Sequence, residues 1–123
     1  MRIVFDIDGT ISFDGISIDP KIKKLLYEQM RLGHELVFAT ARSYRDSVNI
    51  LGDPLNKNRI IALNGGAVYY QGKCVQAHEL DADSFKAMID TCHQLDIPYF
   101  VDDWMNYATF ISDKNSFYQL RRS

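Results

Sequence analysis

The residues best suited to chemistry follow three apolar runs of this sequence. Asp6 and Asp8 come directly after the first run, and Thr40 and Arg42 come after the second. Asn64 follows the third run. Two carboxylates that lie two residues apart at the end of a strand point broadly the same way. One of them can therefore attack while the other moves a proton or helps to hold a cation. This set of side chains suits metal-assisted phosphoryl transfer through an aspartyl-phosphate.

The same segments also offer groups that bind anions. Gly9 allows the backbone to turn sharply and approach a phosphate closely, and Thr10 is its neighbour. Thr40 supplies a hydroxyl, and Ser43 marks the start of a helix whose first amides favour an anion. A phosphate site is therefore expected beside the two carboxylates.

The three apolar runs predict three strands. They lack strict alternation, which is typical of strands buried on both faces of a parallel sheet. The predicted strands cover residues 3–5, 35–39 and 59–63.

Capping residues predict the helices between these strands. Asp19 and Pro20 begin a helix over residues 20–32, which Gly33 is placed to end. Ser43 caps a shorter helix, in which Tyr44, Val48 and Leu51 are predicted to share a face. Strand and helix thus alternate, which predicts an α/β fold with a Rossmann-like parallel sheet. Function is then expected at the carboxyl ends of the strands, where the polar groups converge.

The pattern changes after residue 66. Residues 67–70 and 73–77 flank a Gln-Gly pair and predict a β-hairpin. Asp81 or Asp83 can cap the helix that follows, which is expected to end near residue 95. Further expected elements are strands over 99–101 and 107–111 and a last helix from about residue 116. The expected division is a core over residues 1–78 and a separate segment over 79–123.

Composition excludes several classes of protein. The chain has 123 residues, 46% of them hydrophobic and 24% charged, with a net charge of −2. This mix is typical of a globular domain and provides no basic surface for nucleic acid or an anionic membrane. The first apolar run is too short for a signal peptide, and no run reaches the length of a membrane span. Cys74 and Cys92 stand far apart, so reduced thiols and a cytoplasmic location without a zinc site are expected.

Three motifs resemble those of one enzyme family. The segment Asp6-Ile7-Asp8-Gly9-Thr10 resembles the first motif of the haloacid-dehalogenase superfamily of phosphatases. Residues 38–42 resemble the second motif of its Cof-type branch, and residues 62–67 resemble the segment before its cap. The family usually has Gly where this chain has Ala41, a change that keeps the backbone amide.

The resemblance implies roles for individual residues. Asp6 would be the nucleophile, Asp8 the general acid and base, and Mg²⁺ would be held by Asp6 and by the backbone carbonyl of Asp8. The substrate would be a small phosphorylated metabolite, such as a sugar phosphate. Arg42 and Asn64 would contact this substrate, although a salt bridge and a turn account for them equally well. The residues expected to bind phosphate are Gly9, Thr10, Thr40 and Ala41.

Members of this family are longer than this chain, which therefore resembles the first half of the core followed by the start of an α/β cap. The Lys of the third motif and the acidic cluster of the fourth would then be absent, and activity would be impaired. The first strand would be an uncovered edge without a charged residue before Asp6. Such an edge is expected to recruit a second copy or the missing half.

Other interpretations remain open at this point. A complete, capless phosphatase would place the strand over residues 99–101 beside the first strand, with Asp102 and Asp103 as the fourth motif and Lys73 or Lys86 as the third. A catalytically inactive fragment or a binding module would keep the fold without turnover. A phosphoreceiver domain is disfavoured, because the third strand ends in Asn64 where such a domain needs an Asp.

Overall fold

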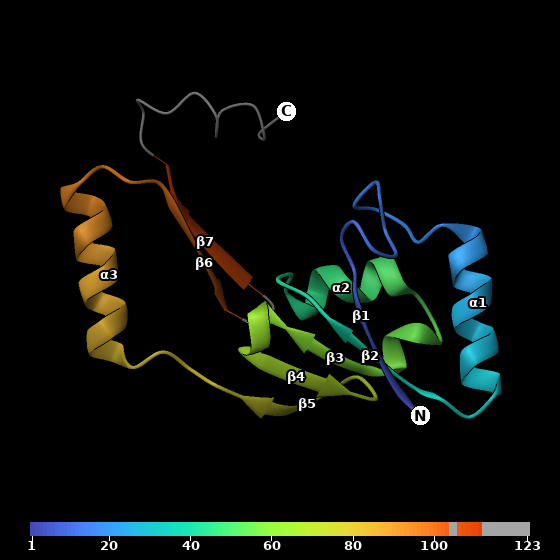
Figure 1. Ribbon diagram of the computed structural model, residues 1–123. Coiled ribbons are helices and arrows are strands. Elements are labelled where there is room, and N and C mark those ends of the chain that lie inside the picture. The colour runs from blue at the N-terminus through green and yellow to red at the C-terminus, as the bar shows by residue number, and fades with distance from the viewer. Residues whose placement is uncertain (104–105, 112–123) are drawn as a thin grey trace. The chain divides into compact units, whose positions relative to one another are not determined.

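A computed structural model of the chain describes residues 1–103 and 106–111 and divides the chain into two compact units, Met1–His78 and Glu79–Ser123 (Figure 1). The helix expected from about residue 116 lies outside the described residues. None of the described helices is long and apolar enough to cross a membrane.

The first unit is built on a five-stranded sheet in the order β1-β2-β3-β4-β5 (Figure 1). β1, β2 and β3 run parallel, whereas β4 and β5 form the expected hairpin and extend the sheet in antiparallel fashion. The α/β fold and its parallel core are therefore confirmed, and the hairpin belongs to the same sheet. The strands are β1 (Arg2–Asp6), β2 (Glu35–Ala39), β3 (Arg59–Ala62), β4 (Ala67–Tyr70) and β5 (Lys73–Ala77).

The helices of this unit begin at the caps that the sequence indicates. α1 (Pro20–Arg31) starts after Asp19, whose side chain accepts a hydrogen bond from the amide of Lys21 at 2.8 Å. α2 (Tyr44–Leu51) starts after Ser43. Two short 3₁₀ helices follow, η1 (Leu55–Lys57) and η2 (Leu63–Gly65).

The buried face of α2 contains one of the three residues expected to share a face. Ser47, Ile50 and Leu51 are buried, whereas Tyr44 and Val48 are only half-buried. The ring of Tyr44 instead stacks on that of Tyr69 in β4, with centroids 3.9 Å apart. Of the residues expected to share a face, Leu51 is therefore in the core, whereas the Tyr44 ring packs against one stacking partner at its rim.

Apolar side chains of the central strands and of both helices form the core. Three consecutive residues of β2 are buried, as a strand between two neighbours requires. The fully buried side chains include Ile7, Leu36, Phe38, Leu51, Leu55 and Ile60.

β1 departs from the prediction of burial on both faces. Its side chains alternate between exposed and half-buried, and Val4 is 58% exposed. β1 is the first strand of the described sheet and has only β2 as a neighbour, which explains this exposure. Pairing of this edge with a second copy stays a prediction.

The second unit contains one helix and one hairpin among its described residues. Asp81, rather than Asp83, caps α3 (Ala82–Gln94) by accepting a hydrogen bond from the amide of Ser84 at 2.9 Å. β6 (Tyr99–Asp103) pairs with β7 (Asn106–Phe110) in an antiparallel sheet of their own. The rings of Tyr99 and Phe110 stack on each other, and both contact His93 of α3.

This pairing bears on the capless alternative. That interpretation needed the strand that ends in Asp102 and Asp103 to lie beside β1. In the described part of the chain, β1 pairs with β2 and β6 pairs with β7, and the capless alternative stays a prediction.

Candidate functional site

The carboxyl ends of β1, β2 and β3 meet around one pocket. Asp6 lies opposite Ala39, and Ala39 lies opposite Ile61, so the three strands end level with one another. The pocket has a volume of about 360 Å³. It is lined by Asp6, Ala39, Thr40, Ala41, Ile61, Asn64 and Gly65.

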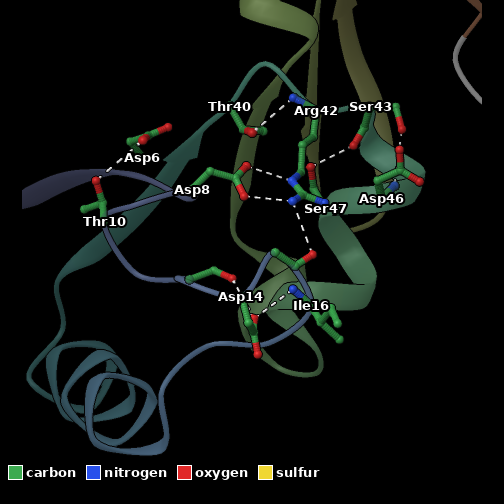
Figure 2. Close-up of polar contacts among 12 residues, drawn as sticks. Asp6, Asp8, Thr10, Asp14, Ile16, Thr40, Arg42, Ser43, Asp46 and Ser47 are labelled. Carbon is green, nitrogen blue, oxygen red and sulfur yellow. Dashed lines mark hydrogen bonds and ion pairs between the residues drawn. The ribbon is translucent and has the colours of Figure 1, made fainter. Parts of the chain in front are cut away.

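Asp6 is the carboxylate of this pocket. It is exposed at the end of β1, and its Oδ2 accepts a long hydrogen bond of 3.5 Å from the hydroxyl of Thr10 (Figure 2). The turn beyond it is held by the carbonyl of Ile7, which accepts the amides of Ile11 and Ser12 at 3.0 and 2.9 Å. These bonds fold the chain back at once and leave the Asp6 carboxylate at the strand end.

The amides of this turn are less available to an anion than the sequence suggested. The Gly9 N–H donates to the carbonyl of Ser12 at 2.8 Å, and the Thr10 N–H makes a long contact of 3.4 Å with the carbonyl of Ile7. Gly9 has a φ of +77°, the left-handed conformation that favours glycine. Its place in the turn is therefore explained by backbone conformation.

Asp8 forms an ion pair with Arg42 across the site. Nε and Nη2 of Arg42 donate to the two carboxylate oxygens of Asp8, each at 2.7 Å (Figure 2). Hydrogen bonding and charge from Arg42 lower the pKa of Asp8 below its usual range, and partial desolvation opposes this. The same pair raises the pKa of Arg42. Asp8 is therefore held as a carboxylate in one orientation.

The loop after β2 presents a hydroxyl and an amide to the pocket. Thr40 is 6% exposed, and its Oγ1 accepts a hydrogen bond from the Arg42 amide at 3.1 Å. Because a hydroxyl that accepts a bond still has its own proton, Thr40 can donate to a ligand oxygen. The hydrogen bonds of this loop engage the amides of Thr40 and Arg42, whereas Ala41 is exposed and lines the pocket. Thr40 does not cap α2, since Ser43 has that role.

Asn64 reaches the pocket through an unusual backbone conformation. Leu63 and Asn64 both have positive φ angles, 53° and 54°. Such a conformation is rare for Leu and costs free energy, so its surroundings must hold it in place. The Leu63 amide donates to the carbonyl of Arg42 at 2.9 Å and the Asn64 amide to that of Thr40 at 3.1 Å. The two loops are thus joined, with Asn64 at the wall of the pocket.

The first turn of α2 already contains a negative charge. The Ser43 hydroxyl accepts a hydrogen bond from the Asp46 amide at 3.2 Å (Figure 2), and the Asp46 carboxylate accepts one from Arg45 Nε at 3.1 Å. Bonding to Arg45 lowers the pKa of Asp46, so it is ionised at neutral pH. The helix terminus is therefore partly satisfied by groups of the chain itself.

Asp14 and Gly15 are site residues that the sequence analysis missed. Asp14 Oδ1 accepts the amide of Ile16 at 2.8 Å (Figure 2) and that of Ser17, also at 2.8 Å. These bonds lower the pKa of Asp14 to about 2. The carbonyl of Gly15 accepts a hydrogen bond from Arg42 Nη2 at 3.2 Å. The Asp-Gly pair is itself a turn signal and could have indicated this loop.

The structure thus brings some of the expected residues together and separates others. Asp6, Thr40, Ala41 and Asn64 line one pocket. Asp8 and Arg42 pair with each other next to it. Of the two lysines considered for a third motif, Lys73 lies in β5 and Lys86 donates to Asp90 within α3 at 2.6 Å.

Comparison with known proteins identifies the family. A family model described as haloacid dehalogenase-like hydrolase matches residues 3–122. A search of curated proteins found no match.

Solved structures share the fold. A phosphatase of the haloalkanoate enzyme superfamily from Bacteroides thetaiotaomicron superposes with a TM-score of 0.75 at 22% identity, over 88% of this chain and 40% of that one. A haloacid dehalogenase-like hydrolase from B. subtilis gives 0.71 at 23% identity, over 80% and 35%. A sugar phosphatase of subclass IIB gives 0.75 at 22% identity, over 88% and 43%.

This chain therefore spans less than half the length of these structures. The family match extends over nearly all of its residues, from the first strand through the second unit. The chain belongs to the haloacid dehalogenase-like hydrolases.

Proposed function

We propose that this chain carries the nucleophile and the phosphate pocket of a Mg²⁺-dependent phosphomonoesterase. The observation that carries the proposal is the pocket at the ends of β1, β2 and β3, which Asp6, Thr40 and Ala41 line together. A carboxylate can attack phosphorus, and the hydroxyl and amide can donate to the oxygens of the same phosphoryl group.

The reaction would proceed in two displacements. A carboxylate oxygen of Asp6 attacks phosphorus, the bond from phosphorus to the ester oxygen breaks, and the leaving alcohol takes a proton from Asp8. Because Arg42 holds Asp8 ionised in the free chain, Asp8 must first gain this proton when the substrate binds. Water then attacks the aspartyl-phosphate, gives a proton back to Asp8, and releases phosphate with the Asp6 carboxylate restored. The sum is phosphomonoester plus water to alcohol plus phosphate, and Asp8 ends as it began.

The described residues fit part of a magnesium site. Asp6 offers an exposed carboxylate, and the hydrogen bonds of the following turn use the carbonyls of Ile7 and Ser12, which leaves that of Asp8 available. No group of three or more His, Cys, Asp or Glu residues suited to a metal occurs in the described part of the chain. Mg²⁺ commonly binds through one or two carboxylates plus water and substrate phosphate, which agrees with this small set. When bound, it would neutralise charge on the transferring group.

The substrate is proposed to be a small phosphorylated metabolite, such as a sugar phosphate. The pocket of about 360 Å³ suits a phosphoryl group with a small organic part. One of the structures with this fold is a sugar phosphatase. We further propose that residues 1–78 act as the catalytic core and that residues 79–123 form part of an α/β cap.

Beryllium trifluoride tests the nucleophile directly, because it forms an aspartyl-phosphate analogue without turnover. With Mg²⁺ present, ¹⁹F NMR of the purified protein should show a bound signal that is absent in Asp6→Asn. The matched control is Asp90→Asn, an exposed acid on α3, which should keep the signal. Persistence of the signal in Asp6→Asn would reject the assignment.

Turnover tests the reaction itself. Release of phosphate from p-nitrophenyl phosphate should require Mg²⁺ and disappear in Asp6→Asn. A bound ¹⁹F signal without phosphate release would show instead a binding module or an inactive fragment.

A further inference from the structure

Arg42 is attached to the site at both its backbone and its side chain. Its amide donates to Thr40 Oγ1 at 3.1 Å, and its carbonyl accepts the Leu63 amide at 2.9 Å. Its guanidinium donates twice to Asp8, in the parallel geometry that fixes a carboxylate most firmly. Arg42 therefore joins the loops that follow β1, β2 and β3.

The guanidinium of Arg42 makes one more hydrogen bond to the loop after β1, at a position where the backbone leaves space for it. Nη2 of Arg42 also donates to the Gly15 carbonyl at 3.2 Å. Gly15 has a φ of +71°, and a Cβ placed there would lie 3.1 Å from the same Nη2. Asp14 holds this turn through the amides of Ile16 and Ser17. The turn after β1 is thus shaped to place a carbonyl, and no side chain, against Arg42.

The pair leaves Asp8 able to exchange a proton. Each carboxylate oxygen has two lone pairs, and the fork of Arg42 uses one on each. The orientation of Asp8 is then fixed while a lone pair of each oxygen stays available. Arg42 itself is not among the described residues that line the pocket, whereas its neighbours Thr40 and Ala41 are.

We propose that Arg42 is a positioning residue that orients Asp8 for proton transfer, and that it does not contact the substrate as the sequence suggested. The inference rests on the proposed function, because Arg42 would act on that reaction only through Asp8, its general acid and base. It also gives Gly15 a role, since a Cβ there would lie 3.1 Å from Nη2 and the guanidinium would have to shift by a few tenths of an ångström.

A double-mutant cycle tests this role. General acid and base catalysis contributes about 10²–10⁴-fold, so loss of orientation in Arg42→Met should lower kcat by about ten- to a hundredfold. KM should change by less than about threefold, since the interaction acts in the transition state. In an Asp8→Asn background, Arg42→Met should cost less than about twofold more, because its effect passes through Asp8. For the slow variants, turnover is measured as release of radiolabelled phosphate from the substrate.

Further variants separate orientation from charge. Arg42→Lys keeps the charge but lacks the two parallel N–H donors of a guanidinium, so the kcat of this variant should remain low. Gly15→Ala keeps Arg42 and should lower kcat in the same direction. The matched control is Arg45→Met, which removes an arginine of similar exposure, 26% against 29%, that pairs with Asp46 instead.

Two outcomes would overturn the proposal. Effects of Arg42→Met and Asp8→Asn that multiply, or a large rise in KM, would show that Arg42 contacts the substrate. Full activity in Arg42→Lys would show that charge alone suffices. Absence of turnover in the wild-type protein would reject the proposed function itself, so the two failures are distinguishable.

The ion pair can also be checked without any assay of activity. In ¹H–¹⁵N NMR spectra, the Nε–H of Arg42 should exchange slowly with solvent in the wild-type protein, because Asp8 accepts it at 2.7 Å. Asp8→Asn and Gly15→Ala should both accelerate this exchange. An unchanged exchange rate in Asp8→Asn would contradict the geometry on which the role depends.

Discussion

Replacing Thr40 by Val removes one oxygen from the site and almost no volume, so its effect isolates the hydroxyl. Thr40 is 6% exposed, and its Oγ1 accepts the Arg42 amide at 3.1 Å. An unpaired buried donor costs about 1–3 kcal/mol. Because the Arg42 amide is only partly buried, we expect the lower end, about 1 kcal/mol in the free energy of unfolding.

Urea denaturation measures this change. With a slope of about 2 kcal/mol per molar, a loss of about 1 kcal/mol lowers the midpoint by about 0.5 M. Near-ultraviolet circular dichroism suits the measurement, because it detects packed aromatic rings. The rings of Tyr44 and Tyr69 stack within the first unit, with centroids 3.9 Å apart. An unchanged slope would show that only stability was altered.

Two controls make the result specific. Thr40→Ser keeps the acceptor and should recover most of the midpoint. Thr91→Val removes a hydroxyl that donates to a carbonyl on the exposed surface of α3, and should leave the midpoint nearly unchanged. If Thr40→Val has the midpoint of the wild-type protein, the hydroxyl does not hold the Arg42 amide and the description of this loop is wrong.

Three further predictions concern stability of the first unit. Ser43→Ala removes the cap of α2 and should cost about 0.5–2 kcal/mol by urea denaturation, whereas the exposed Asn49→Ala should cost nothing. Ile60→Ala, at a position with 0% exposure, should cost about 2–5 kcal/mol, far more than Val75→Ala, which is 53% exposed. The pKa of Asp14, lowered to about 2, means that its contribution to stability is complete above its unfolded pKa and is lost as the pH falls through about 2. Acid titration monitored by circular dichroism should therefore show less loss of stability between about pH 4 and 2 in Asp14→Asn than in the wild-type protein.

Local signals explain why most element boundaries could be predicted. A cap acts on amides two or three residues away, so Asp19 and Ser43 mark helix starts wherever the rest of the chain lies. The choice between Asp81 and Asp83 could not be made in this way. Both are acids before the same helical pattern, and only the bond from the Ser84 amide selects Asp81.

Exposure depends on neighbours, which local patterns do not contain. The apolar run at residues 3–5 correctly predicts a strand of a parallel sheet. The run alone does not show that β1 has a single neighbour among the described strands and that Val4 is 58% exposed; the expectation of an uncovered edge came instead from the resemblance to the first half of a longer core. The same limit applies to α2, where Tyr44 packs in an aromatic stack at the rim of the core.

Some features of the candidate site could likewise be predicted from sequence patterns, whereas others depend on how distant segments come together. That Asp6, Thr40 and Asn64 meet follows from a general rule, because parallel strands bring their carboxyl ends to one edge. The pairing of Asp8 with Arg42 needs more: residues 34 apart in sequence must be aligned by the register of β1 and β2, and a turn must leave space for the guanidinium. A long, flexible arginine can reach either a substrate or a carboxylate from the same backbone position. The two bonds from the guanidinium to Asp8, with the Gly15 carbonyl as a further acceptor, decide between them in favour of Asp8.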